Sequence, residues 1–159
     1  MENMEEITMK KLVSISFMTA AILAGCGSVD TSPRTIDAET DICEICNMGI
    51  TSMDYAAQAI LSNNDYQVFD DLGCLIEFLQ TTDKKVEVAY IKSADTGEWV
   101  DVKKATYLYS SNYWTPMNYG VLAFASQEGA SQYAKENGEG ESVAYDDLLT
   151  TFNWGVHTH

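Results

Sequence analysis

Apolar and polar positions along the chain change their period several times within short distances, which predicts short strands and helices in alternation. The segments 55–61 and 66–69 are rich in apolar and aromatic residues, and the turn-forming residues 62–65 join them, so they predict a β-hairpin. Further strands are predicted by alternating or continuous apolar segments at 86–91, 99–102, 106–109 and 119–125. The middle two of these are either two short strands or one interrupted ribbon.

Helical spacing of apolar residues follows the predicted hairpin. Leucine and isoleucine recur at i, i+3, i+4 and i+7 from Leu72 to Leu79, which predicts a helix with one buried face that ends near Gln80. Asp70 or Asp71 is placed to cap its first turn.

Two shorter helices are predicted nearer the C-terminus. One lies between a capping Ser126 and Gly138, and the other spans 145–151. Short elements with local connections predict an α+β fold, with small mixed or antiparallel sheets. We expect two ββα-type halves, each packed against a helix.

The N-terminal residues have the pattern of an export signal. Lys10 and Lys11 precede 13 residues of mainly apolar character, 12–24, which is shorter than the roughly 20 residues that a membrane-spanning helix needs. The segment Leu23-Ala24-Gly25-Cys26 resembles the lipobox of bacterial lipoproteins. This predicts that residues 1–25 are a lipoprotein signal peptide, with translation starting at Met1 or Met9.

The lipobox also predicts how the rest of the chain is divided. Cys26 would be acylated and hold the protein at a membrane surface, and the alternative is an ordinary signal with a coincidental cysteine. Residues 26–40, mostly polar, predict a lipidated tether, and residues 41–159 predict the folded domain. The location expected for it is the cell envelope, on the extracytoplasmic side.

The net charge of the chain limits the classes of molecule that it can bind. The 159 residues include 9 Lys and Arg against 24 Asp and Glu, a formal net charge of −15. Such an acidic surface repels phosphate backbones, so we expect no nucleic-acid partner. A cationic ligand or a basic protein partner remains compatible with it.

Three cysteines follow the predicted anchor at Cys26. Because three is an odd number, they cannot all be paired in disulfides within one chain. Cys43 and Cys46 form a C-x-x-C motif, and Met48 adds a thioether two residues later. Soft sulfur donors favour soft metals, Cu(I) above all. The pair could instead be a thiol–disulfide redox pair, half of a zinc site or a plain disulfide.

The third cysteine, Cys74, falls in the first turn of the helix predicted after the hairpin, away from its leucine face. There the helix dipole favours a thiolate. Cys74 would either pack against a second layer or face the other sulfur atoms.

An ordered series of short motifs resembles the NosL family, the lipoprotein accessory proteins of nitrous oxide reductase. The matching pieces are the lipobox at Cys26, Cys43-x-x-Cys46-x-Met48, Phe69-Asp70-Asp71-Leu72-Gly73-Cys74, Trp99-Val100-Asp101-x-x-x-Ala105-x-Tyr107, Thr115-Pro116-Met117-x-x-Gly120-Val121-Leu122-Ala123-Phe124, Ala130-x-x-Tyr133-Ala134 and Tyr145-Asp146-Asp147-Leu148. They cover nearly all of the chain after the signal peptide. Three positions depart from the family's usual motifs. Glu44 replaces the usual Pro, Asn47 replaces the usual Gly, and Asn118 stands where Gly often follows Pro-Met.

The resemblance implies a membrane-anchored copper-binding lipoprotein that delivers Cu(I) for assembly of nitrous oxide reductase, together with that enzyme's ABC-transporter machinery. It implies an α+β fold similar to organomercurial lyase. The candidate copper ligands are Cys43, Cys46, Met48, Met117 and, more weakly, Cys74, while His157 and His159 could close a site from the tail or lie in solvent. We expect a carrier and not an enzyme; the alternatives are a thiol–disulfide redox module and lyase-like cleavage of carbon–mercury bonds.

Overall fold

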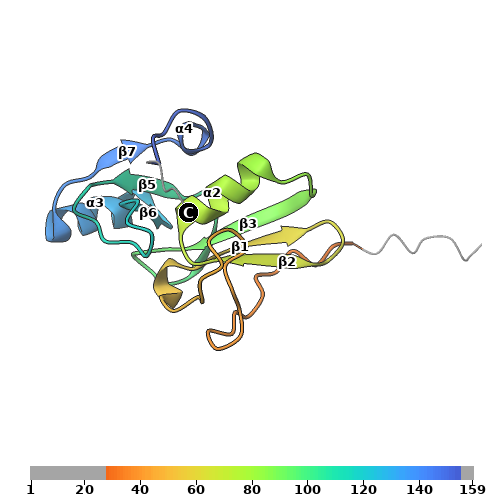
Figure 1. The fold of residues 1–159 in the computed structure, drawn as a ribbon. Coiled ribbons are helices and arrows are strands. Elements are labelled where there is room, and N and C mark those ends of the chain that lie inside the picture. Colours follow the sequence, from red (N-terminus) through yellow and green to blue (C-terminus); the bar gives the residue numbers. More distant parts are fainter. Residues whose placement is uncertain (1–27, 155–159) are drawn as a thin grey trace, which may run out of the picture.

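The computed structural model describes residues 28–154, which form two antiparallel sheets with helices packed between and beside them (Figure 1). The first sheet has the order β2-β1-β3-β4. Its strands are β1 (Ala57–Leu61), β2 (Tyr66–Phe69), β3 (Val86–Lys92) and β4 (Trp99–Asp101), preceded by a short 3-10 turn, η1 (Met53–Tyr55). All five residues of β1 are buried, because this strand has neighbours on both sides and a covered surface on each face.

The second sheet has the order β6-β5-β7, and three α-helices complete the fold. The strands are β5 (Thr106–Tyr109), β6 (Val121–Phe124) and β7 (Glu141–Val143); the helices are α2 (Leu72–Thr81), α3 (Gln127–Asn137) and α4 (Tyr145–Thr150). The α+β class with two small antiparallel sheets is therefore confirmed.

Several element boundaries differ from the sequence prediction. The first strand begins at Ala57, because residues 53–55 form η1. The possible ribbon 99–109 is two strands that belong to different sheets. The strand β7 was not predicted, since its three residues are exposed or half-buried and carry little apolar pattern. Its insertion gives the second half the order ββαβα.

The helix α2 lies over the first sheet and also contacts β6 and α4, so it joins the two halves of the molecule. Asp71 is its N-cap, and the Asp71 side chain accepts a hydrogen bond from the backbone N–H of Gly73 at 2.8 Å. The predicted buried face is present, with Leu72, Leu75 and Ile76 in the main core cluster. This packing fixes the start of α2 against both sheets.

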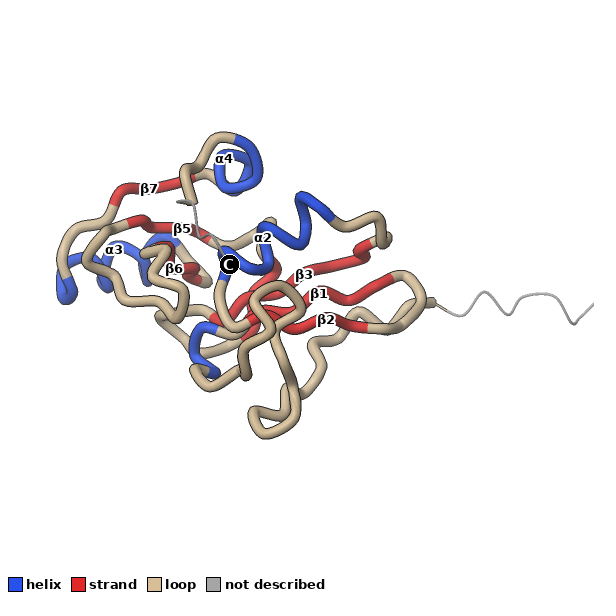
Figure 2. The backbone as a smooth tube through the Cα atoms, in the orientation of Figure 1, coloured by secondary structure: helices blue, strands red, loops and turns tan. Residues whose placement is uncertain are grey.

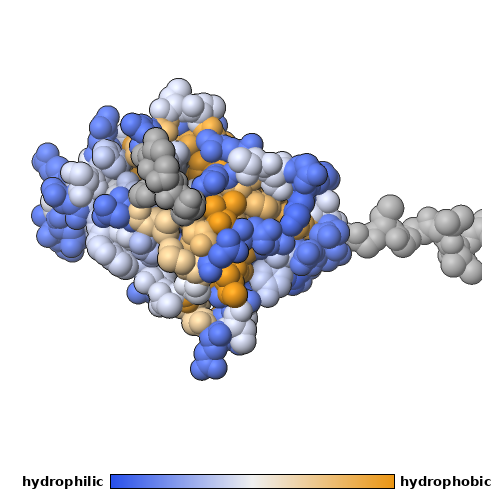
Figure 3. Space-filling model, in the orientation of Figure 1, coloured by the Kyte–Doolittle hydropathy of each residue, from blue (hydrophilic) through white to orange (hydrophobic). Residues whose placement is uncertain are grey.

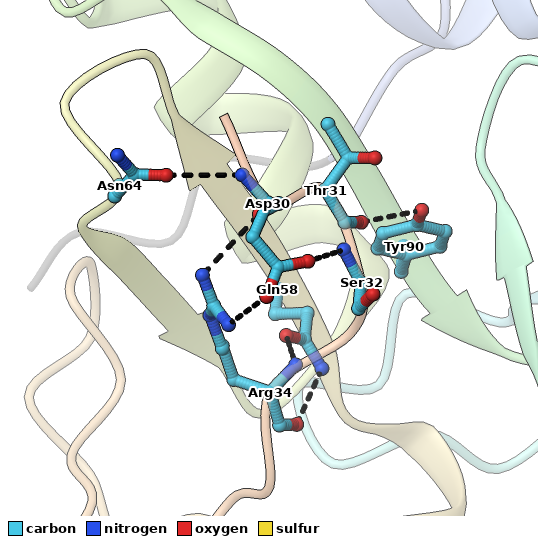
Figure 4. A network of polar contacts seen from close by, with 7 residues as sticks. All are labelled: Asp30, Thr31, Ser32, Arg34, Gln58, Asn64 and Tyr90. Atoms are coloured by element: carbon cyan, nitrogen blue, oxygen red, sulfur yellow. Dashed lines mark hydrogen bonds and ion pairs between the residues drawn. The ribbon is translucent and has the colours of Figure 1, made fainter. Parts of the chain in front are cut away.

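The segment that precedes the first sheet is held on it by polar contacts (Figure 4). The Gln58 side chain in β1 accepts a hydrogen bond from Arg34 N–H at 2.7 Å and donates one to Arg34 C=O at 3.1 Å. The Tyr90 hydroxyl in β3 donates to Thr31 C=O at 2.8 Å, and Asp30 N–H donates to the Asn64 side chain at 3.0 Å. From Asp30 onward, the segment predicted as a tether therefore lies on the domain.

The predicted signal peptide and the lipidation site Cys26 lie outside the described residues. Within residues 28–154, no helix has the length and apolar character needed to cross a bilayer.

Candidate metal centre

A tight loop carries the C-x-x-C motif. An antiparallel bridge between Ile42 and Gly49 closes the loop, and inside it Cys43 N–H donates to Met48 C=O at 2.8 Å. Asn47 N–H donates back to Cys43 C=O at 3.0 Å, and Asn47 takes a left-handed φ of 58°. Asparagine tolerates this conformation, so Asn47 can stand where the resembled motif usually has glycine.

The loop is docked beside the end of β2. The backbone N–H of Glu44 donates to Val68 C=O at 3.1 Å. Asp70 follows β2 directly, Asp71 caps α2, and Cys74 lies in the first turn of this helix. Loop, strand end and helix start thus meet at one point, and Figure 2 shows loops around the start of α2.

Three thiols and one carboxylate gather at this point. The sulfur atoms of Cys43, Cys46 and Cys74 and a carboxylate oxygen of Asp70 all lie within 4.8 Å of one another. Two sulfur atoms on a common ion, each at about 2.3 Å from it, are at most about 4.6 Å apart. A small contraction therefore suffices for these groups, which we call the sulfur cluster, to bind one metal ion.

Protonation within the sulfur cluster is uneven. A hydrogen bond from the Cys74 thiol, helped by backbone N–H groups of Cys46, Asp70 and Ile45, lowers the pKa of Cys43 to about 6 against the opposing effect of burial. The same contact, with burial, raises the pKa of Cys74. Burial raises the pKa of Cys46 to about 12, and its thiol donates to Asp70 Oδ1 at 3.4 Å. Cys43 is therefore the thiol of the cluster that ionises most readily.

Exposure is also uneven. Cys43 is 0% and Cys74 1% exposed, and Asp70 is 3% exposed, whereas Cys46 is only half-buried. Met48, next to Cys46 in the loop, is 45% exposed. An ion would therefore enter and leave on the side of Cys46 and Met48.

A second loop, residues 115–120, reaches the cluster from the other half of the molecule. Met117 N–H donates to Asp71 Oδ2 at 3.2 Å, so this loop is tied to the start of α2. Thr115 Oγ1 accepts from the backbone of Tyr119 at 3.0 Å, and Asn118 takes a left-handed φ of 59°. Met117 packs against the same core cluster as the three cysteines.

Of the sequence-predicted ligands, Cys43, Cys46 and Cys74 come together. The open question about Cys74 is answered, because it faces the other sulfur atoms. Met48 and Met117 lie in the two loops that flank the cluster. His157 and His159 lie outside the described residues.

Asp70 was not among the predicted ligands. A carboxylate directly after a strand and four residues before a cysteine was the available signal, but Asp70 was considered as a helix cap and as a carboxylate of the lyase-like alternative, not as a metal ligand. Asp71 is the residue that caps the helix, which leaves Asp70 free to face the sulfur atoms. All three described cysteines are free thiols in this structure.

The donor set is soft enough for copper. Three sulfur atoms with one partly open side match the preference of Cu(I) for few, polarisable ligands. The carboxylate is a harder donor and adds negative charge beside any bound cation.

Comparisons with known proteins place the chain in a family. The model of the NosL family matches residues 33–152, which is most of the chain. The fold is similar to the crystal structure of the copper chaperone NosL from Shewanella denitrificans, with a TM-score of 0.67 and 16% identity over 77% of this chain and 99% of that one. A comparison with curated proteins gave no significant match. The chain therefore belongs to the NosL family.

Proposed function

We propose that this protein is a copper chaperone that carries one Cu(I) ion in the sulfur cluster. The observation that supports this most strongly is the meeting of three cysteine sulfur atoms within 4.8 Å at a point with one exposed side. Membership in the NosL family and a fold shared with a protein described as a copper chaperone point the same way. The family is one of carriers and not of enzymes.

A carrier has to hold its cargo and still release it. The Cys43 thiolate and the Cys74 thiol are buried and would form the fixed side of the site. Cys46 is half-buried on the open side, so a ligand from an acceptor can replace it first. Release by stepwise exchange of sulfur ligands avoids a naked ion in solution.

The thioethers would assist at the opening. Methionine is neutral at any pH and forms no disulfide, so Met48 and Met117 can ligate Cu(I) where thiols are at risk of oxidation. Met48 is exposed beside Cys46, and Met117 is held near the start of α2. We assign them to capture and transfer, while the cysteines retain the ion.

The finer assignment follows the resemblance in the sequence. We propose that the cargo serves the copper centres of nitrous oxide reductase and that its assembly and ABC-transporter machinery are the partners. A lipid on Cys26 would hold the domain at the membrane, on the extracytoplasmic side of the cell envelope. Because Asp30 N–H donates to Asn64 in the turn between β1 and β2, only residues 27–29 would separate such an anchor from the domain.

The test is an anaerobic competition titration between the protein and a Cu(I) chelator. We expect one Cu(I) per chain. Loss of a residue that only supports the metal ligands costs up to roughly 100-fold in metal affinity, so Cys43→Ser or Cys74→Ser, which removes a ligand, should weaken Cu(I) binding by more than that. Met48→Leu should cost less. If the cysteine variants bind Cu(I) as tightly as the wild type, the proposed function is wrong.

A further inference from the structure

Exposed hydrophobic side chains lie in the C-x-x-C loop and directly before the loop 115–120. Within residues 28–154, the large hydrophobic residues that stand exposed are Ile42, Met48 and Trp114, at 58%, 45% and 59%. Single exposed apolar side chains are ordinary on a protein surface. Ile42 and Met48 belong to the C-x-x-C loop, and Trp114 directly precedes the loop 115–120, which Met117 ties to Asp71 at the start of α2.

The contacts that place them are short. Ile42 is joined to Cys43, and Met48 C=O accepts the Cys43 N–H. Trp114 packs edge-on against Tyr55 with ring centroids 5.2 Å apart, and Tyr55 lines the same small cavity as Asp71. Figure 3 shows hydrophobic side chains gathered at the centre of one face, with hydrophilic ones around them.

The surroundings of these side chains are acidic. The stretch 35–83, which builds the whole sulfur cluster, contains ten Asp and Glu and no Lys or Arg. Glu44 in the C-x-x-C loop, Asp54 in η1 and Glu77 in the middle of α2 are exposed. Lys84 reaches Glu44 at 3.6 Å, but both side chains are more than 40% exposed, so this pair neutralises little.

We call the exposed Ile42, Met48 and Trp114, together with a rim of Glu44, Asp54 and Glu77, the mouth surface. We propose that the mouth surface docks a protein that exchanges copper and whose own contact surface is basic around an apolar centre. The proposal rests on the function proposed above and adds the chemistry of the partner. Apolar contact would exclude water during ligand exchange, and opposite charges would orient the encounter. A second copy of this chain does not fit, because it would bring the same acidic rim.

Charge steering gives the proposal a measurable signature. Association between opposite charges is faster than neutral association by about 10- to 1000-fold and slows as ionic strength rises. Transfer of Cu(I) to a basic acceptor should therefore be fast and sensitive to salt. Affinity for Cu(I) alone should not depend on the rim or on Trp114.

The experiment uses the Cu(I)-loaded protein and two synthetic acceptor peptides. Both contain a central Cys-x-x-Cys beside a leucine, and they differ only in flanking lysines or flanking glutamates. We expect transfer to the lysine peptide to be at least about tenfold faster at low salt, with the difference lost at high salt. Equal rates for the two peptides would overturn the proposal.

Variants separate the mouth surface from the site itself. Trp114→Ala should slow transfer several-fold without changing Cu(I) affinity. The pair Asp54→Asn with Glu77→Gln should slow transfer to the lysine peptide, while the matched pair Glu128→Gln with Glu141→Gln, on α3 and β7, should leave it unchanged. Equal effects of both acidic pairs would mean that only net charge matters and would also overturn the proposal.

Two further outcomes separate a failure of the proposed function from a failure of the docking proposal. If the wild type binds no Cu(I), the proposed function fails before docking is tested. If it binds Cu(I) but sediments as a dimer whose formation requires Trp114, the mouth surface is a self-contact and the docking proposal is wrong.

Discussion

The thiol of Cys46 donates a hydrogen bond to Asp70 Oδ1 across 3.4 Å, so the most exposed cysteine of the cluster is positioned by a buried carboxylate. This contact joins the C-x-x-C loop to the junction of β2 and α2. It also places a hard oxygen donor beside three soft ones, which raises the question of what the carboxylate does for a soft cargo.

We predict that Asp70→Asn changes Cu(I) affinity by no more than about tenfold, because Cu(I) relies on the sulfur atoms and the amide can still accept the Cys46 hydrogen bond. Removing the charge also eases ionisation of Cys46 and Cys74, whose pKa values Asp70 helps to raise. Competition with a Cu(I) chelator measures the effect. A loss as large as that of Cys43→Ser would instead make Asp70 a copper ligand.

Gly73→Ala should destabilise the protein and weaken copper binding. A Cβ atom at Gly73 would lie 2.2 Å from the Tyr119 ring, so either the ring or the first turn of α2 must move, and Cys74 would move with it. Overpacking of this kind costs about 1–3 kcal/mol. Denaturant unfolding and Cu(I) competition measure the two effects.

The matched control is Gly49→Ala in the cysteine loop, where nothing lies within 4 Å of an added Cβ atom. We expect this variant to be close to wild type in stability and affinity. If Gly73→Ala behaves like Gly49→Ala, the contact between Tyr119 and α2 does not position Cys74.

The stability of the metal-free protein should depend on pH through Cys43. Its folded pKa of about 6 lies below the ordinary thiol value of 9.0, so its contribution is complete above pH 9 and is lost as the pH falls through 6. Between pH 6 and 8 the wild type should gain on the order of 1–2 kcal/mol relative to Cys43→Ser. Denaturant unfolding of both proteins, anaerobically, gives the difference.

The same residue has a spectroscopic signature. Thiolate ultraviolet absorbance in the folded metal-free protein should titrate one group near pH 6, and Cys43→Ser should remove that step. If the first thiolate forms only near pH 9, the hydrogen bond from Cys74 does not stabilise the Cys43 anion.

Asn47 allows a backbone test of the loop that leaves every sulfur atom in place. Its φ of 58° suits glycine and asparagine but strains a β-branched residue, and the side chain is exposed. Asn47→Gly should be nearly neutral, whereas Asn47→Val should cost about 1–2 kcal/mol and weaken Cu(I) binding by distorting the C-x-x-C turn. Equal affinities for the two variants would show that the loop conformation does not control the site.

The sequence predicted the elements whose signals are local. The Leu72–Leu79 spacing, the capping aspartate and serine, and the hairpin at 55–69 all depend on neighbouring residues, and the structure confirms them with shifts of a few residues. The exposed strand β7 has no such signal. It forms because β5 offers a free edge, which is a property of the folded sheet.

The site was predictable in part for the same reason. Cys43 and Cys46 share a turn, so their proximity can be derived from spacing alone. Cys74 and Asp70 join them because the Glu44–Val68 contact brings the loop to the end of β2, and no local pattern encodes that contact. The sequence offered both Asp70 and Asp71 as the helix cap, and because Asp71 caps the helix in the structure, Asp70 can face the sulfur atoms.

The most direct test of the account is X-ray absorption on the anaerobic, Cu(I)-loaded protein. The sulfur cluster predicts about three sulfur neighbours around copper in the wild type and one fewer in Cys74→Ser. A first shell dominated by nitrogen or oxygen, or a sulfur count that Cys74→Ser leaves unchanged, would contradict the central claim that the three cysteines hold the ion together.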